Sequence, residues 1–120
     1  MHILTEQELH NLAMNIVGKQ LEKEGFEFLA VNSELRKNPQ FVCTKDKKMR
    51  FVVVKAIGYP GDPKDIEFFR SDLNKMKEHA LKFEASTYYA AVGLVNASDY
   101  NLPVYLNEEY IVDFDGLMEI

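Results

Sequence analysis

The sequence predicts an α+β fold in which helices pack on one mixed β-sheet. Two stretches carry apolar residues at the three- and four-residue steps of an amphipathic helix, and stretches rich in branched and aromatic residues follow each of them. The apolar run Arg50–Ala56 is typical of a central strand that is buried on both faces. The length of 120 residues fits one domain, residues 1–120, with a core that needs no disulfide.

The first predicted element is a helix over Glu6–Lys23. Thr5 and Glu8 have the spacing of a capping box, in which each side chain accepts a hydrogen bond from the other residue's backbone amide. Gly25 suits the left-handed position just beyond a helix end. The apolar stripe expected to face the core comprises Leu9, Leu12, Ala13, Ile16, Val17 and Leu21.

Three strands follow this helix, at Phe26–Asn32, Gln40–Thr44 and Met49–Ile57. The second and third are separated only by the polar turn Lys45–Lys48, so we expect them to form a hairpin. The polar connection Asn32–Pro39 joins the first strand to the second.

A second helix is predicted over Lys64–Phe83. Asp62 is placed to cap it, and Pro63 suits the first helical position. A strand follows at Thr87–Asn96. Because a helix between two strands is a crossover connection, this strand should lie parallel to the third strand. The predicted buried stripe of the second helix comprises Ile66, Phe69, Leu73, Met76, Ala80 and Phe83.

Two short strands, Pro103–Leu106 and Tyr110–Phe114, complete the predicted order of helix, three strands, crossover helix, strand and two short strands. A cystatin-like cone is the rival fold for such an order. The crossover helix favours the parallel pair instead, and a fully antiparallel sheet would refute that choice.

Composition excludes several classes of function. The net charge of −5 and the pI near 5.2 disfavour nucleic acid as a partner, because phosphate contact needs clustered Lys and Arg. The single cysteine, Cys43, cannot form an internal disulfide or hold an iron–sulfur cluster. No signal peptide and no apolar run long enough to span a bilayer are visible. We therefore expect a cytoplasmic protein that has no membrane partner and no cofactor.

A resemblance to a known superfamily rests on the third strand and the segment before the second. Phe51–Ala56, with Lys55 near its end, resembles the third-strand motif Phe-Val-Glu-Val-Lys-Thr of the PD-(D/E)XK nuclease-like (restriction-endonuclease-like) superfamily, most nearly that of its small YraN-like bacterial proteins. Asn38–Gln40 falls on the Glu-Ile-Asp segment of those proteins, and Lys75 and Ala80 fall on their helix positions. The likeness extends from about Leu9 to Leu94.

The resemblance implies a site whose catalytic carboxylates are missing. In the family, an aspartate on strand two and a glutamate on strand three hold a divalent metal ion that activates water, and a lysine helps to orient the nucleophile. Here Gln40 stands at the aspartate position and Val53 at the glutamate position, and only Lys55 remains. We therefore assign no catalytic residue and no metal ligand. The carboxylates that a relocated metal site would have to recruit are Glu8, Asp46, Asp62 and Asp65.

The remaining signals have ordinary structural interpretations beside functional ones. Lys55 is either a strand-end lysine that extends over apolar surface or a retained pocket residue. Cys43 fits a buried small residue better than a nucleophile. The histidines His2, His10 and His79 lack metal-ligand spacing, the basic residues Lys45, Lys47, Lys48 and Arg50 surround one hairpin, and the tyrosines Tyr88, Tyr89, Tyr100, Tyr105 and Tyr110 suit either a core or an interface.

Three functional hypotheses follow, and the sequence favours a role other than an enzyme's. The first is a catalytically inactive nuclease-like domain that serves as a binding or scaffold module with a protein partner, as a homodimer whose open sheet edge supports pairing. The second is a diverged metal-dependent nuclease with a relocated site. The third is an accessory protein of the sodium-translocating NADH-quinone reductase, akin to the component of that complex that carries a ferredoxin cysteine cluster, which the chain lacks.

Overall fold

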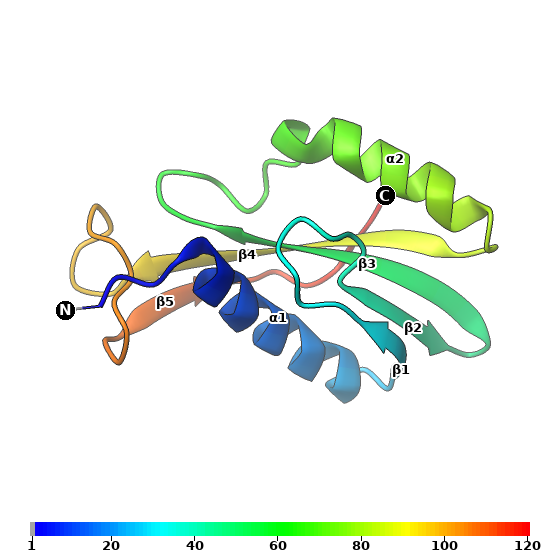
Figure 1. The fold of residues 1–120 in the computed structure, drawn as a ribbon, viewed down its shortest axis with the longest axis horizontal. Helices are drawn as coiled ribbons and strands as arrows, with labels where there is room; N and C mark the ends of the chain where they lie inside the picture. The colour runs from blue at the N-terminus through cyan, green and yellow to red at the C-terminus, as the bar shows by residue number, and fades with distance from the viewer. Residues whose placement is uncertain (1) are drawn as a thin grey trace.

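Two helices and a six-stranded mixed sheet make up the fold, as the α+β prediction required (Figure 1). The structure is a computed structural model and describes residues 2–120. In chain order the elements are α1 (Glu6–Lys23), β1 (Glu27–Val31), β2 (Phe41–Lys45), β3 (Lys48–Ile57), a 3₁₀ turn (Glu67–Phe69), α2 (Arg70–Leu81), β4 (Ser86–Asn96), β5 (Tyr110–Asp113) and β6 (Met118–Glu119). The strand order in the sheet is β1-β2-β3-β4-β5. The short strand β6 also pairs with β4, along the same edge as β5.

Helix α1 has the bounds and both ends that the sequence predicted. The Thr5 hydroxyl accepts from the Glu8 amide at 3.1 Å, and the Glu8 carboxylate accepts from the Thr5 amide at 2.9 Å. At the other end Gly25 has a φ of 87°, and the amide of Phe26 donates to the carbonyl of Leu21 at 3.0 Å. With the bond from the Gly25 amide to the Glu22 carbonyl at 3.0 Å, this forms a Schellman motif, which satisfies the last carbonyls of the helix.

The pairing of the central strands also confirms the prediction. β2 and β3 form an antiparallel hairpin, and its two turn residues, Asp46 and Lys47, both have positive φ, as a type I′ turn requires. β3 and β4 run parallel over eight residue pairs, from Arg50 opposite Ser86 to Ile57 opposite Gly93. The parallel pair rules out the fully antiparallel alternative.

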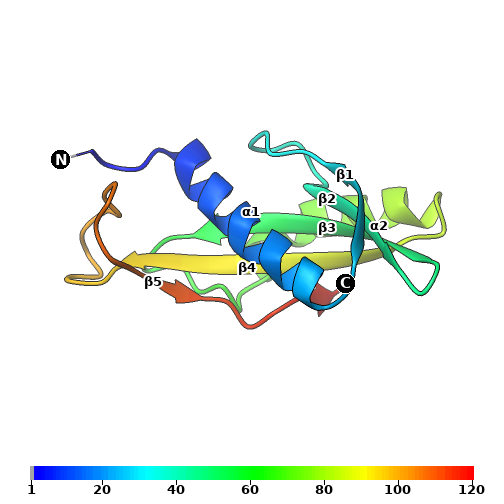
Figure 2. The same ribbon diagram turned by 90° about the horizontal axis from the view of Figure 1, so that it is seen from below.

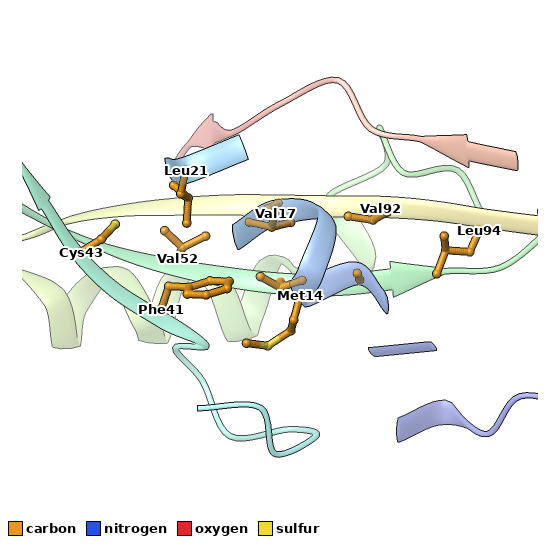
Figure 3. Packing of buried hydrophobic residues seen from close by; sticks show 11 residues of the cluster. Met14, Val17, Leu21, Phe41, Cys43, Val52, Val92 and Leu94 are labelled. Atoms are coloured by element: carbon orange, nitrogen blue, oxygen red, sulfur yellow. The ribbon is translucent and has the colours of Figure 1, made fainter. Parts of the chain in front are cut away.

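Strand β3 supplies the core on both sides of the sheet, as its uninterrupted apolar sequence predicted. Val52 and Val54 face α1, whereas Phe51 and Val53 face α2, and all four are buried. Figure 2 shows the two helices on opposite faces of the sheet. The core beneath α1 is the larger one, and Figure 3 shows its residues Met14, Val17, Leu21, Phe41, Cys43, Val52, Val92 and Leu94.

The start of the second helix is a correction. The sequence predicted Lys64–Phe83, but the helix proper is Arg70–Leu81, and the shorter 3₁₀ turn Glu67–Phe69 precedes it. Asp62 does not cap a helix. Its carboxylate and that of Asp65 each accept from the backbone amide two residues ahead, at 2.9 and 3.1 Å, so both residues close local turns.

The predicted strand Pro103–Leu106 is also wrong. Pro103 has no N–H to donate to a ladder, and the backbone beyond it bonds to the segment before α1 rather than to the sheet. The Val104 carbonyl accepts from the Leu4 amide at 3.0 Å, and the Leu106 amide donates to the His2 carbonyl at 2.8 Å.

The second short strand of the fold is instead β6, which the sequence analysis missed. Its two residues pair with Tyr88 and Tyr89, and the amide of Ile120 then donates to the Thr87 carbonyl at 2.9 Å. The predicted strand Tyr110–Phe114 is confirmed as β5. Within residues 2–120, no helix combines the length and the apolar character that a bilayer crossing requires.

Gly93 allows the loop before α2 to pack against the sheet. A Cβ atom there would lie 2.8 Å from Pro63 Cγ and 3.1 Å from Asp113 Cβ. We predict that Gly93→Ala lowers the free energy of unfolding by about 1–3 kcal/mol, the usual cost of overpacking. Urea denaturation monitored by circular dichroism measures the change.

Gly58→Ala is the matched control, because a Cβ atom at Gly58 meets nothing within 4 Å. We expect this control to be neutral, or to stabilise by up to about 1 kcal/mol through the reduced entropy of the unfolded chain. Equal effects of the two substitutions would contradict the packing role of Gly93.

Candidate functional site

The three positions that the resemblance singles out lie on or beside the second half of β3, but they do not form one constellation. Gln40 stands one residue before β2, while Val53 and Lys55 lie on β3. Each has a different environment, and each environment decides what the residue can do.

Gln40 is fully buried, and both ends of its amide are occupied. Its Oε1 accepts from the Val54 amide at 2.6 Å, and its Nε2 donates to Asn38 Oδ1 at 2.8 Å and to the Lys37 carbonyl at 3.3 Å. Its backbone amide also donates to the Val52 carbonyl at 3.0 Å. The side chain therefore continues the β2–β3 hydrogen bonding by one step beyond β2, and its one oxygen already accepts from the Val54 amide.

Val53 is 1 % exposed and packs under α2 against Leu73 and Tyr89. It is a core residue with no donor atom. Its neighbour Val54 is tied through its amide to Gln40. The two positions that the resemblance assigns to metal-binding carboxylates are therefore used for packing and for backbone bonding.

The carboxylates that a relocated metal site would recruit are engaged elsewhere. Glu8 caps α1 and contacts His2 at 2.9 Å, while Asp62 and Asp65 close turns. Asp46 lies in the hairpin turn at the far end of β3 from Lys55. Residues 2–120 contain no group of three or more His, Cys, Asp and Glu side chains placed to share a cation. The donor set at these positions does not fit a divalent metal.

Lys55 is half-buried and makes a specific contact. Its Nζ lies 5.2 Å from the centroid of the Phe69 ring, which is within the range of a cation–π interaction. Burial lowers the pKa of Lys55, the charge of Arg36 lowers it further, and Asp72 opposes these effects. The ammonium group is therefore partly desolvated, and no carboxylate of residues 2–120 forms an ion pair with it.

A pocket of about 290 Å³ lies beside Lys55, between α1, the loop before β2 and the end of β3. One of its lining residues, His10, is 2 % exposed, and its Nε2 atom has no hydrogen-bond partner among the described residues. The pKa of His10 is lowered by burial and by the charge of Lys55. The complete lining is Glu6, Leu9, His10, Leu35, Arg36, Lys55, Ala56 and Gly58.

Sequence reasoning missed His10 as a pocket residue, although a signal was present. His10 precedes Ala13, Met14 and Val17 by three, four and seven residues, so it lies on the buried stripe of α1. A polar residue on such a stripe needs either a partner or a cavity.

Three other residues considered in the sequence analysis, Arg50, Cys43 and His79, have structural roles. The Arg50 guanidinium lies 4.9 Å from the Phe26 ring centroid and 5.5 Å from that of Tyr88. Cys43 is buried, and burial raises its pKa to about 11, which disfavours the nucleophilic thiolate. His79 packs with the rings of Phe51 and Phe83.

Comparison with known proteins adds one finding. Residues 7–120 match the family described as Domain of unknown function (DUF8840). No curated protein matches the chain.

The hydrogen bonds of the Gln40 side chain predict how the stability of a Gln40→Glu variant depends on pH. In Gln40→Glu, one carboxylate oxygen can still accept from Val54, but the other faces Asn38 Oδ1 and the Lys37 carbonyl, so it needs a proton to bond. The folded-state pKa of the new Glu should therefore be raised above the unfolded value of about 4.3. Stability relative to wild type is then retained below that value and is lost as pH rises through the folded pKa.

We expect Gln40→Glu to be less stable than wild type by about 1–3 kcal/mol at pH 8, the cost of a buried group left unpaired, and to approach wild-type stability near pH 4. Urea denaturation at both pH values measures this difference. Gln20→Glu, at a half-buried position on α1, is the control, and its stability relative to wild type should change little with pH. A Gln40→Glu deficit that does not change with pH would contradict the assigned bonds.

Proposed function

The chain belongs to the DUF8840 family, and we propose that it is a catalytically inactive PD-(D/E)XK nuclease-like domain that serves as a binding or scaffold module. The single observation that carries the proposal is the use of Gln40. The position where the nuclease-like proteins hold a metal-binding aspartate is occupied by a buried amide whose hydrogen bonds join the chain before β2 to β3.

The arrangement of elements supports the resemblance on which this proposal depends. An opening helix, an antiparallel hairpin, a crossover helix and a strand parallel to β3 follow in the order that the resemblance implies. Lys55 lies at the end of β3, where the third-strand motif would put it.

The two alternatives lack supporting geometry in the described residues. A diverged nuclease needs carboxylates near Lys55, and Glu8, Asp62 and Asp65 are engaged in caps and turns. A redox accessory role would need cysteine ligands, whereas Cys43 is the only cysteine and is buried. A buried, unreactive thiol suits the cytoplasm, where we place the protein.

The proposed module acts as a homodimer through β5. This strand forms an edge of the sheet, all four of its residues are exposed, and three of them are the apolar Tyr110, Ile111 and Val112. Antiparallel pairing about a twofold axis at the strand centre would set Ile111 opposite Val112 of the second copy and keep the two Asp113 carboxylates apart. An exposed apolar edge of this kind favours pairing with another strand.

We predict that neither Mn²⁺ nor Mg²⁺ binds stoichiometrically in calorimetric titrations, and that the purified protein does not cleave DNA in their presence. The melting temperature is an independent check. It should not rise with metal concentration, because only a ligand that binds the folded state raises the melting temperature. Lys55→Ala is the control. Stoichiometric binding, with cleavage that Lys55→Ala abolishes, would overturn the proposal in favour of the diverged nuclease.

We predict that sedimentation analysis finds a dimer and that Val112→Lys shifts it to monomer, because a charged side chain would enter the apolar edge pairing. Leu81→Lys, at an exposed apolar position on α2, is the matched control and should leave the dimer intact. A wild-type protein that stays monomeric at high concentration, or loss of the dimer in Leu81→Lys, would refute the β5 interface.

A further inference from the structure

We propose that the groove between α1 and β1 binds an extended segment of a partner protein, which adds to the sheet at β1 and carries a carboxylate side chain near one end. Such a segment is the kind of partner that the proposed binding module would hold, so the site rests on that proposal. β1 is an edge of the sheet, because it pairs with β2 on one side and with no strand of residues 2–120 on the other. Its free backbone groups are the ones with which an extended peptide pairs.

β1 has few of the features that protect an edge strand from such pairing. Four of its five residues are exposed, and two of these are apolar: Leu29 is 55 % exposed and Val31 is 58 % exposed. The register with β2 shifts between Phe28 and Ala30, which marks a bulge, and a bulge is one common protection. The strand contains neither proline nor lysine, which are two others. The apolar edge therefore suits cover by a partner.

The groove follows β1 on the side of the sheet that α1 covers. It has a volume of about 550 Å³, and its apolar lining includes Phe28, Val31 and Phe41. α1 lines it from Asn11 to Glu22, which is about 16 Å of helix at a rise of about 1.5 Å per residue. That length matches roughly five residues of extended chain. The groove can therefore hold the alternate side chains of a strand that adds to β1.

Two cations lie over the ring of Phe26, the residue that precedes β1. Lys45 Nζ is 5.4 Å from the ring centroid, and the guanidinium carbon of Arg50 is 4.9 Å from it. Arg50 also lies 5.5 Å from the centroid of the Tyr88 ring, so two aromatic rings fix its position. Phe26 packs on the core beneath α1, as Phe28 does, so the cations lie on the same side of the sheet as the groove and beyond one end of it.

These two cations provide the charge that points to an acidic partner. No ion pair within residues 2–120 involves Lys45 or Arg50, and the carboxylate of Glu119 accepts from a tyrosine hydroxyl instead. The groove itself contributes one charge of each sign, Lys19 and Glu22. An unbalanced positive charge therefore remains at its end, although the net charge of the protein is −5. A carboxylate of the added strand would balance it, and a guanidinium group can bind both carboxylate oxygens.

Strand geometry sets the order of side chains in the partner. Antiparallel pairing is the commoner kind, and it would place the later residues of the segment beside Phe26. Because alternate side chains of a strand face the same side, we expect two apolar residues at alternate positions, followed two residues later by Glu or Asp. Nucleic acid fits less well, since its phosphates would extend along an acidic protein. A second copy would be joined through β5, which the proposed dimer already uses.

The test measures binding of a fluorescein-labelled peptide, Ser-Val-Thr-Val-Thr-Glu-Ser with blocked ends, to the full chain by fluorescence anisotropy. We expect saturable binding that weakens about tenfold or more when Lys replaces the Glu of the peptide, because the change removes a charge-assisted hydrogen bond. The bound peptide should also slow hydrogen exchange of backbone amides in Glu27–Val31, since strand pairing protects them.

Val31→Lys should weaken binding of the peptide about tenfold or more, because it places a charge on the apolar edge. Arg50→Gln should weaken binding of the Glu peptide but not of the Lys peptide. If Arg50→Gln fails to fold, Lys45→Gln tests the same contact near the exposed hairpin turn. Leu81→Lys is the matched control, because it introduces the same charge at an exposed apolar position on α2, and it should bind like wild type.

Five outcomes would overturn the proposal: no saturable peptide binding, equally tight binding of the Lys peptide, equal weakening in Leu81→Lys, displacement of the peptide by a DNA oligonucleotide, or loss of the dimer in Val31→Lys, which would assign this edge to a second copy. Any of them, found for a protein that neither binds Mn²⁺ nor cleaves DNA, would refute the β1 site alone. Mn²⁺-dependent cleavage would instead refute the proposed function.

Discussion

The hydrogen bond from the Val54 amide to Gln40 Oε1 is the constraint on which the centre of the molecule depends. β2 begins at Phe41, opposite Val52, so the last part of β3 extends beyond its antiparallel partner. A buried strand cannot leave its amides without acceptors, and the Gln40 side chain supplies the first one that β2 does not. The Asn38 side chain in turn holds Gln40 in place at 2.8 Å. The hydrogen bonding between β3 and the segment before β2 therefore continues through one side chain.

That arrangement explains why the end of β3 has a different chemistry from the rest of the strand. From Phe51 to Val54 every residue is buried by helices or neighbouring strands, and the side chains can only be apolar. From Lys55 onward the cover becomes partial, so a long charged side chain fits, with its ammonium group over the Phe69 ring. The pocket lies at this transition, where α1, the loop before β2 and β3 meet without filling the space between them.

Local signals predicted much of the fold, and non-local ones were missed. The capping box at Thr5, the glycine after α1 and the hairpin at Asp46 are encoded within a few residues, and the structure confirms each. Asp62 was misassigned because the same carboxylate can cap a helix or close a turn, and only the packing of the loop decides between them. The site was harder to predict because its bonds join distant positions. Gln40 bonds to Val54, fourteen residues later in the sequence, and no periodicity reports such a contact. The buried stripe of α1 could not distinguish a satisfied core histidine from His10, whose Nε2 has no hydrogen-bond partner among the described residues and which lines a pocket that exists only once α1, the loop and β3 have come together.

Because Cys43 is buried, reaction of its thiol with a reagent reports on opening of the protein core. The thiol lies in the core between β1 and β3, is inaccessible to solvent, and has its pKa raised to about 11. A thiol reagent can therefore react only with molecules in which the core between α1 and the sheet has opened. Since there is no second cysteine to complicate the signal, the labelling rate of unmodified protein measures how often the core beneath α1 opens under native conditions.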